Sequence, residues 1–89
     1  MFAIVENDWF MNDPDREDTQ EIYVRAVCQS FTDALPKMAK YIEEAEAELA
    51  RKGWKVSPAN CFCEDYVHVV GIANDKRTWS KAFTIKCVG

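Results

Sequence analysis

The fold of this chain is decided by residues 30–53, which read SFTDALPKMAKYIEEAEAELARKG. Apolar side chains recur there at alternating steps of four and three residues, which places them on one face of an α-helix. They are Phe31, Leu35, Met38, Ile42, Ala45 and Leu49. The opposite face is charged, so the pattern predicts one amphipathic helix that buries its apolar face against another element.

Both ends of this helix carry recognisable signals. Ser30 with Asp33 resembles a capping box, but Pro36 would then lie inside the helix, where it lacks a hydrogen-bond donor and clashes with the preceding turn. If Asp33 caps instead, Pro36 falls in the tolerated first turn. We therefore expect the regular helix to begin near Asp33 and to end at Gly53, the usual left-handed terminator.

Strand-like segments lie on both sides of the helix. Residues 2–10 and 21–29 before it, and 65–73 and 78–88 after it, are rich in β-branched and aromatic types. Polar loops join each pair into a hairpin, and residues 53–61 form a linker with a short extended piece at 54–56. A hairpin or a helix alone is marginal in water. The predicted fold is therefore α+β with the order ββαββ, a four-stranded sheet made of two hairpins with the helix packed on one face.

Alternation within the strands predicts which side chains share a face. In the second strand Ile22, Val24, Ala26 and Cys28 share one face, and Tyr23, Arg25, Val27 and Gln29 share the other; in the last strand Trp79, Phe83, Ile85 and Cys87 fall together. One helix covers only one face of such a sheet. We therefore expect Tyr23, Val27 and part of the Val67 and Val69 row on an open face that binds a partner or a second copy. Loops or Lys and Arg stems are the alternative cover.

Length and composition indicate a single domain spanning residues 1–89. Hydrophobic residues make up 48% and charged residues 29%, values ordinary for a soluble folded protein. The N-terminal sequence MFAIVENDWF has no basic leader and its apolar run stops at Glu6, so neither a secretory signal nor a membrane span is expected. The expected location is cytoplasmic, where the cysteines would be reduced thiols.

Charge is distributed unevenly along the chain. The net charge is −4, and residues 1–21 carry seven acidic side chains against one basic one. An acidic protein is a poor ligand for nucleic acid or anionic membranes, because phosphate neutralisation by Lys and Arg dominates that binding. We expect a protein partner with a basic surface, no membrane and no direct nucleic acid, with a homodimer as an alternative. The predicted partner-binding residues are Asp13, Asp15, Glu17, Asp18, Glu44 and Glu48.

No catalytic constellation or phosphate-binding glycine loop is evident, so we expect a protein that is not an enzyme and uses no cofactor. Cys61, Cys63 and His68 are weak metal candidates, with Cys28 and Cys87 as further ligands. The spacing of the Cys pair is shorter than in zinc knuckles, and the acidic residues beside it oppose thiolate formation. A small zinc or thiol-redox protein is one alternative hypothesis, and a self-associating structural protein is another.

In size, acidity and strand–helix layout, the whole chain resembles the small acidic proteins with which phages block host defences, anti-CRISPR proteins among them. The resemblance is one of format, since no family motif carries it. It implies a non-enzymatic inhibitor in the host cytoplasm that binds a host nucleic-acid-handling complex through acidic and aromatic surface. Because the rest of the chain carries ten basic and eight acidic residues, we expect a local acidic site rather than mimicry of nucleic acid over the whole surface.

Overall fold

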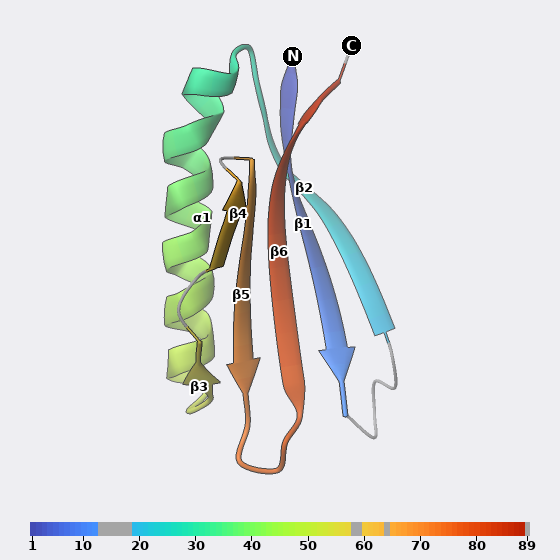
Figure 1. Cartoon of the computed structure of the whole chain (residues 1–89), viewed down its shortest axis with the longest axis vertical. Coiled ribbons are helices and arrows are strands. Elements are labelled where there is room, and N and C mark those ends of the chain that lie inside the picture. The colour runs from blue at the N-terminus through green and yellow to red at the C-terminus, as the bar shows by residue number, and fades with distance from the viewer. Residues whose placement is uncertain (13–18, 58–59, 64, 89) are drawn as a thin grey trace.

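An antiparallel sheet with one helix against it forms the molecule (Figure 1). The computed structural model describes residues 1–12, 19–57, 60–63 and 65–88, with the backbone alone at residues 19 and 60–63. The elements are β1 (Phe2–Met11), β2 (Thr19–Cys28), α1 (Phe31–Arg51), β3 (Lys55–Val56), β4 (Asn60–Cys63), β5 (Tyr66–Ile72) and β6 (Thr78–Cys87). Within these described ranges, no helix combines the length and apolar character needed to cross a membrane.

The strands follow the order β2-β1-β6-β5, with β3 and β4 both paired to the outer edge of β5. The two predicted hairpins, β1–β2 and β5–β6, are confirmed, as is the packing of the helix against the sheet. The prediction of four strands is wrong, because the expected linker supplies two more. The piece expected at 54–56 forms β3, and the chain returns to β5 as β4.

The first and last strands pair with each other at the centre of the sheet. Their register runs from Phe2 opposite Cys87 to Met11 opposite Thr78. The N–H of Val88 donates to the carbonyl of Met1 at 2.8 Å, and the two ends of the chain lie side by side in Figure 1. The middle of the sheet is therefore built from the two most distant parts of the sequence.

The helix begins earlier than predicted. The Oγ of Ser30 accepts a hydrogen bond from the N–H of Asp33 at 3.1 Å, which makes Ser30 the N-cap and places Pro36 inside α1. Pro36 has no N–H for the carbonyl of Thr32, but Thr32 is exposed and water can bond that carbonyl. The cap and the apolar face together outweigh the local cost of the proline.

The predicted end of α1 is confirmed. Gly53 has a φ of 77°, its N–H donates to the carbonyl of Ala50 at 3.0 Å, and the N–H of Trp54 donates to that of Leu49 at 3.2 Å. This is a Schellman motif. In the same turn of helix, Leu49 packs directly on β5, where a Cβ added to Gly71 would lie 2.7 Å from its Cδ2. Gly71 thus lets the helix approach the sheet closely.

The core lies between α1 and the sheet face beneath it, the helix-covered face. Its central members are Ile4, Cys28, Ala34, Met38, Ala45, Val67, Phe83 and Ile85. All six helix positions predicted to be apolar and inward are buried or half-buried. The expectation that Val67 and Val69 face outward is wrong. They pair with Phe83 and Lys81 on the helix-covered face, and both are buried.

A β-bulge divides β2. Ala26 pairs with Ile4 and Val24 pairs with Val5, so Arg25 is the extra residue, without a pairing residue on β1. An extra residue inverts the alternation of side chains beyond it.

The bulge corrects the predicted faces of β2. Ala26 and Cys28 lie on the helix-covered face as part of the core or against it. Ile22 and Val24, predicted to share that face, lie instead on the opposite, helix-free face together with Val27. The simple alternation in the sequence cannot reveal this, because it assumes an unbroken strand.

Candidate functional site

Among the residues that the structure describes, three acidic or basic side chains lie buried on the helix-covered face. Glu6 and Asp8 lie between Ile4 and Phe10 on the same face of β1, and Lys81 lies opposite Asp8 on β6. Their relative exposures are 3% for Glu6, 2% for Asp8 and 3% for Lys81. We refer to these three residues as the buried charge cluster.

The ammonium group of Lys81 is the centre of this cluster. Its Nζ lies 3.2 Å from Glu6 Oε2, 3.4 Å from Asp8 Oδ2 and 3.6 Å from Glu48 Oε2 of α1. It also lies 4.2 Å from the centroid of the Trp79 ring, and Trp79 Nε1 donates to Asp8 Oδ2 at 3.2 Å. One cation therefore meets three carboxylates and an aromatic face, and it links the sheet to the helix.

The two buried carboxyl groups have opposite pKa shifts. Burial alone would raise the pKa of Glu6, but its contacts with Asp8 and Arg25 and the charge of Lys81 outweigh burial and lower that pKa to about 2. Burial and the neighbouring Glu6 carboxylate raise the pKa of Asp8 to about 7, against the effect of Lys81. Asp8 Oδ1 has no hydrogen-bond partner among the described residues. A buried oxygen without a partner costs less on a neutral carboxyl than on an anion, which agrees with the raised pKa.

A carboxyl group with a pKa near 7 has the property required of a general acid or base. Asp8, however, is enclosed by Lys81 and Trp79 and does not line the cleft above the cluster. In this position it contacts Lys81 and Trp79 rather than a molecule bound in that cleft. The arrangement therefore supports a structural and electrostatic role for the cluster.

A cleft of about 210 Å³ opens between α1 and the sheet beside the buried charge cluster. It is lined by Glu6, Arg25, Tyr41, Glu44, Ala45, Glu48 and Lys81, and we call it the acidic cleft. Arg25 Nε donates to Glu6 Oε1 at 2.8 Å, and the hydroxyl of Tyr41 donates to the carbonyl of Arg25 at 3.2 Å. Three carboxylates face two cations there, so an added positive charge is favoured over an added negative one.

The structure brings together two of the six predicted partner-binding residues. Glu44 and Glu48 lie one turn apart on α1, and both line the acidic cleft. Glu44 is exposed, whereas Glu48 is half-buried beside Lys81. The other four, Asp13, Asp15, Glu17 and Asp18, lie outside the described residues.

Of the predicted metal and thiol residues, the structure describes the side chains of His68, Cys28 and Cys87, and it does not bring these three to one place. His68 lies on the helix-free face, where its Nε2 forms a hydrogen bond with Ser80 Oγ and burial lowers the pKa of the imidazole. Cys28 and Cys87 are free thiols on the helix-covered face. They pair with Phe2 from its two sides, which separates them by two strand spacings, roughly 9–10 Å.

His68 therefore does not lie together with Cys28 or Cys87 at one metal site, because the sheet separates the imidazole from both thiols. The candidate site at Cys61, Cys63 and His68 stays a prediction. The side chains of Cys61 and Cys63 lie outside the described residues. Among the side chains that the structure does describe, no group of three or more His, Cys, Asp or Glu is placed to hold a metal ion.

Among the described strand residues, the large apolar side chains with the highest exposed fractions lie on the helix-free face. Ile22 is 64% exposed, Val24 65% and Val27 52%, and all three lie on β2. We call them the open row. Figure 1 shows that the first half of β2 diverges from α1, so the helix covers neither face of it. Tyr23 pairs with Glu6, so it lies on the helix-covered side of β2, and it is 38% exposed.

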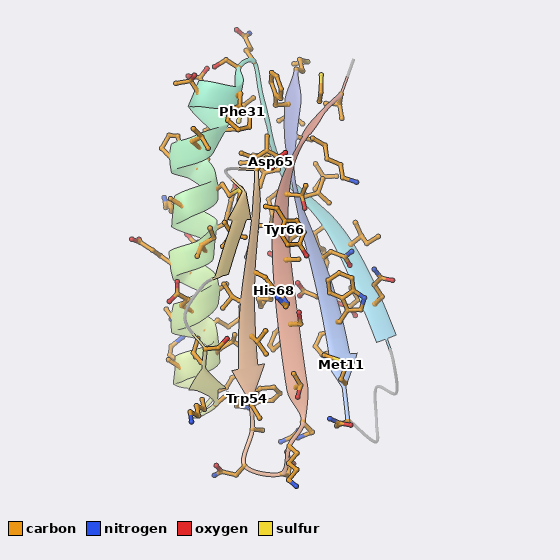
Figure 2. All side chains as sticks on the ribbon, viewed as in Figure 1. Met11, Phe31, Trp54, Asp65, Tyr66 and His68 are labelled. Carbon is orange, nitrogen blue, oxygen red and sulfur yellow. The ribbon has the colours of Figure 1, made fainter. Side chains whose placement is uncertain are left out.

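The helix-free face is mixed in character away from the open row. Tyr66 and His68 on β5 and Met11 at the end of β1 belong to it (Figure 2). Small side chains lie at its centre, where Ser80 and Ala82 are buried between larger neighbours. Met11 and Ile72, which flank Thr78 on this face, are 41% and 44% exposed, so the most exposed apolar side chains of the face are those of the open row.

Sequence analysis missed the buried charge cluster. Its signal was present, because Lys81 falls between Trp79 and Phe83 in the alternation that predicted a core face, and Glu6 and Asp8 occupy the corresponding positions in the first strand. Three charged residues at positions that belong to an otherwise apolar face indicate a buried ionic network.

Comparison of this chain with protein-family models, with curated proteins and with solved structures finds no match. No relative therefore assigns a role to any residue.

Proposed function

We propose that this chain is a non-enzymatic protein-binding module whose partner packs on the open row. The observation that carries the proposal is the exposure of three neighbouring β-branched side chains, Ile22, Val24 and Val27, each more than half accessible. Single exposed aliphatic residues are normal, but a contiguous group on one strand is typical of an interaction surface. Full burial of each such side chain stabilises a complex by roughly 1.5–3 kcal/mol before the costs of association.

The charge distribution favours a partner with a basic surface. The net charge is −4, and Glu44 stands exposed at the acidic cleft. Such charges mainly accelerate encounter and select orientation, while apolar contact supplies the affinity. In this proposal the acidic side chains steer the partner and the open row holds it.

In a narrower form, the partner is a host nucleic-acid-handling complex and the protein is an anti-defence inhibitor of the anti-CRISPR type. Support for this form comes from Glu44 and Glu48, which present carboxylates to the same cleft, and from the acidic sequence at residues 13–18. A carboxylate pair of this kind competes with phosphate for Lys and Arg side chains.

The test is capture of a partner from host lysates by the immobilised full chain, followed by mass spectrometry. The double variant Ile22→Lys/Val24→Lys should lose the partner, whereas Ala47→Lys, an exposed substitution on α1, should retain it. Circular dichroism and thermal unfolding confirm that both variants are folded. Capture that is unaffected by the double variant, or no stoichiometric partner from any plausible host, rejects the proposal.

Steering by the acidic cleft is tested on the partner so identified. Glu44→Lys should lower the association rate constant several-fold at low ionic strength and have little effect on dissociation. An equal effect at high salt would show that Glu44 contacts the partner directly.

A further inference from the structure

We propose that β2 pairs edge to edge with β2 of a second copy, in an antiparallel dimer in which Tyr23 of one copy lies opposite Tyr23 of the other and the twofold axis passes between them. The proposal goes beyond the protein-binding function, because it uses the edge of β2 rather than the face that carries the open row. Either statement can hold without the other.

The two edges of the sheet differ. One edge is broken into the short strands β3 and β4, whereas β2 runs for ten residues and pairs, within the described chain, with β1 alone. Its outward N–H and C=O groups are a template for another strand. Residues 19–28 contain neither Pro nor Lys, the residues that commonly prevent such pairing. The bulge at Arg25 interrupts the pairing with β1, so the edge is regular up to this residue and not beyond it.

The regular part of the edge has a sequence that is complementary to itself in one register. A twofold axis perpendicular to the sheet keeps every side chain on its own face. Because opposite residues of an antiparallel pair point to the same face, one residue must then lie opposite its own copy, and the axis passes between the two. With Tyr23 opposite its own copy, Glu21 lies opposite Arg25 of the second copy and Ile22 lies opposite Val24. Opposite charges and β-branched pairs are favourable cross-strand neighbours, and the symmetry forms each pair twice.

Neighbouring registers lack this complementarity. A register with Ile22 opposite its own copy places Glu21 opposite Tyr23, and a register with Val24 opposite its own copy places Glu21 opposite Val27. Neither forms a charge pair. The pattern of residues 21–25 therefore selects Tyr23 as the centre of the dimer.

The side chains of this register are already ordered on the surface. The guanidinium carbon of Arg25 lies 4.9 Å from the centroid of the Tyr23 ring, and the hydroxyl of Tyr23 donates to Glu21. Arg25 uses Nε to bond Glu6, and its side chain is still 39% exposed. A guanidinium has five N–H donors, so it can bond a second carboxylate across the interface while it holds the first.

The dimer also enlarges the surface used by the proposed function. Both helices lie on one side of the extended sheet, because the axis is perpendicular to it. On the other side, Ile22 and Val24 of the two copies meet at the dimer centre as one apolar patch. A partner of the open row would then bind a twofold-symmetric surface.

The experiment is a charge exchange, read by sedimentation equilibrium of the full chain over a concentration series. A thiol reductant is present because Cys87 is exposed. Wild type should be a dimer. Glu21→Arg alone places two guanidinium groups opposite each other, Arg25→Glu alone places two carboxylates opposite each other, and each should weaken the dimer about tenfold or more. An equimolar mixture of the two variants restores both opposite-charge pairs and should form a heterodimer.

The control is Glu43→Arg, which makes the same charge change at an exposed position on α1 and should leave the dimer intact. Glu21→Arg does not touch the Glu6–Arg25 pair, so it tests the dimer even if Arg25→Glu fails to fold. A folded Glu21→Arg variant that dimerises as wild type does would overturn the proposal, as would folded variants that do not associate when mixed. A wild-type protein that is monomeric at every concentration, or that forms open-ended aggregates, also overturns the proposal. The proposed function is tested separately by partner capture, whose outcome does not depend on the dimer.

Discussion

Each residue of the buried charge cluster is costly by itself. Transfer of an ion into the interior costs several kcal/mol even after relaxation, and only the mutual contacts offset this. Asp8 lies directly opposite Lys81 in only one register of β1 against β6, and in that register both side chains point to the helix-covered face. A slip of one residue would place Glu6 and Asp8 on the helix-free face and break the contacts to Glu48. The cluster therefore specifies the register of the central pair as much as it stabilises it.

The cluster predicts a large effect of a single substitution at Lys81. Lys81→Met keeps the length of the side chain but leaves Glu6 and Asp8 without their shared cation, and should lower the free energy of unfolding by about 3–5 kcal/mol. Lys86→Met, on the same strand but exposed, should change it by less than about 0.5 kcal/mol. Urea unfolding at neutral pH measures both. Equal stability of the two variants would show that Lys81 is not coupled to the carboxylates.

Because the pKa of Asp8 is raised in the folded protein, we expect the free energy of unfolding to fall as the pH rises from about 5 to above 7. The pKa of Asp8 is 3.8 in an unperturbed chain and about 7 in the folded protein, so in this interval the folded state holds a proton that the unfolded state has released. Deprotonation then costs folding free energy, roughly 2 kcal/mol between pH 5 and 7.5. Urea titrations of wild type and Asp8→Asn should differ in this slope, because the amide is neutral throughout.

Other groups do not obscure that comparison. Glu6, with its pKa lowered to about 2, contributes stability that is complete above its ordinary value of 4.5 and is lost only as the pH falls toward 2. His68, whose pKa burial lowers, gives stability that rises with pH through its ordinary range, and it is common to both proteins. If Asp8→Asn does not reduce the pH dependence of the free energy of unfolding, the group responsible for that dependence is not Asp8.

At the scale of elements, the contact of α1 with β5 depends on the absence of a side chain at Gly71. Gly71→Ala forces the buried Leu49 side chain to move and should destabilise the protein by about 1–3 kcal/mol. Leu49→Ala should cost about 2–5 kcal/mol. In the double variant the added methyl group occupies part of the space that the shortened side chain leaves, so the two costs should not add. Additivity within about 0.5 kcal/mol would show that the two residues are not in contact.

The elements differ in how far the sequence predicts them. The helix is predictable because its apolar period and its Gly53 terminator are local signals. Its start is predicted near Asp33, because Pro36 counts against the Ser30 cap that the structure shows. The faces of β2 are not, because one bulged residue at Arg25 inverts the alternation without any distinctive composition. Of the candidate site, Glu44 and Glu48 follow from charge on a helix face, whereas their approach to Lys81 depends on how the helix crosses the sheet.

For the whole molecule, the pairing of β1 with β6 is the feature least accessible to sequence reasoning. Both strands read correctly as strands, but nothing local to either indicates the other, about eighty residues away. Formation of the sheet centre requires closure of a loop that contains every other element, and this closure costs entropy before the pairing contributes stability. The topology therefore predicts slow folding for a chain of this size.

A circular permutation tests this consequence. A short Gly-Ser linker joins the two ends of the chain, which already lie side by side, and a new opening is made between Cys28 and Gln29, so that Ser30 still caps the helix. The chain order becomes α1, β3, β4, β5, β6, β1, β2, in which β5, β6, β1 and β2 each follow directly a strand with which they pair. Folding should accelerate about tenfold or more, with the free energy of unfolding within about 1–2 kcal/mol of wild type.

The matched control uses the same linker but opens the chain between Asn74 and Asp75, at the tip of the β5–β6 hairpin. This permutant also makes β6–β1 a local pairing, yet it makes β5–β6 a distant one, so it should gain much less speed. Stopped-flow refolding of the three proteins separates the effects. If the first permutant refolds no faster than wild type, the distance between the two central strands does not limit folding, and a step common to all three chains, such as docking of α1 on the sheet, must do so.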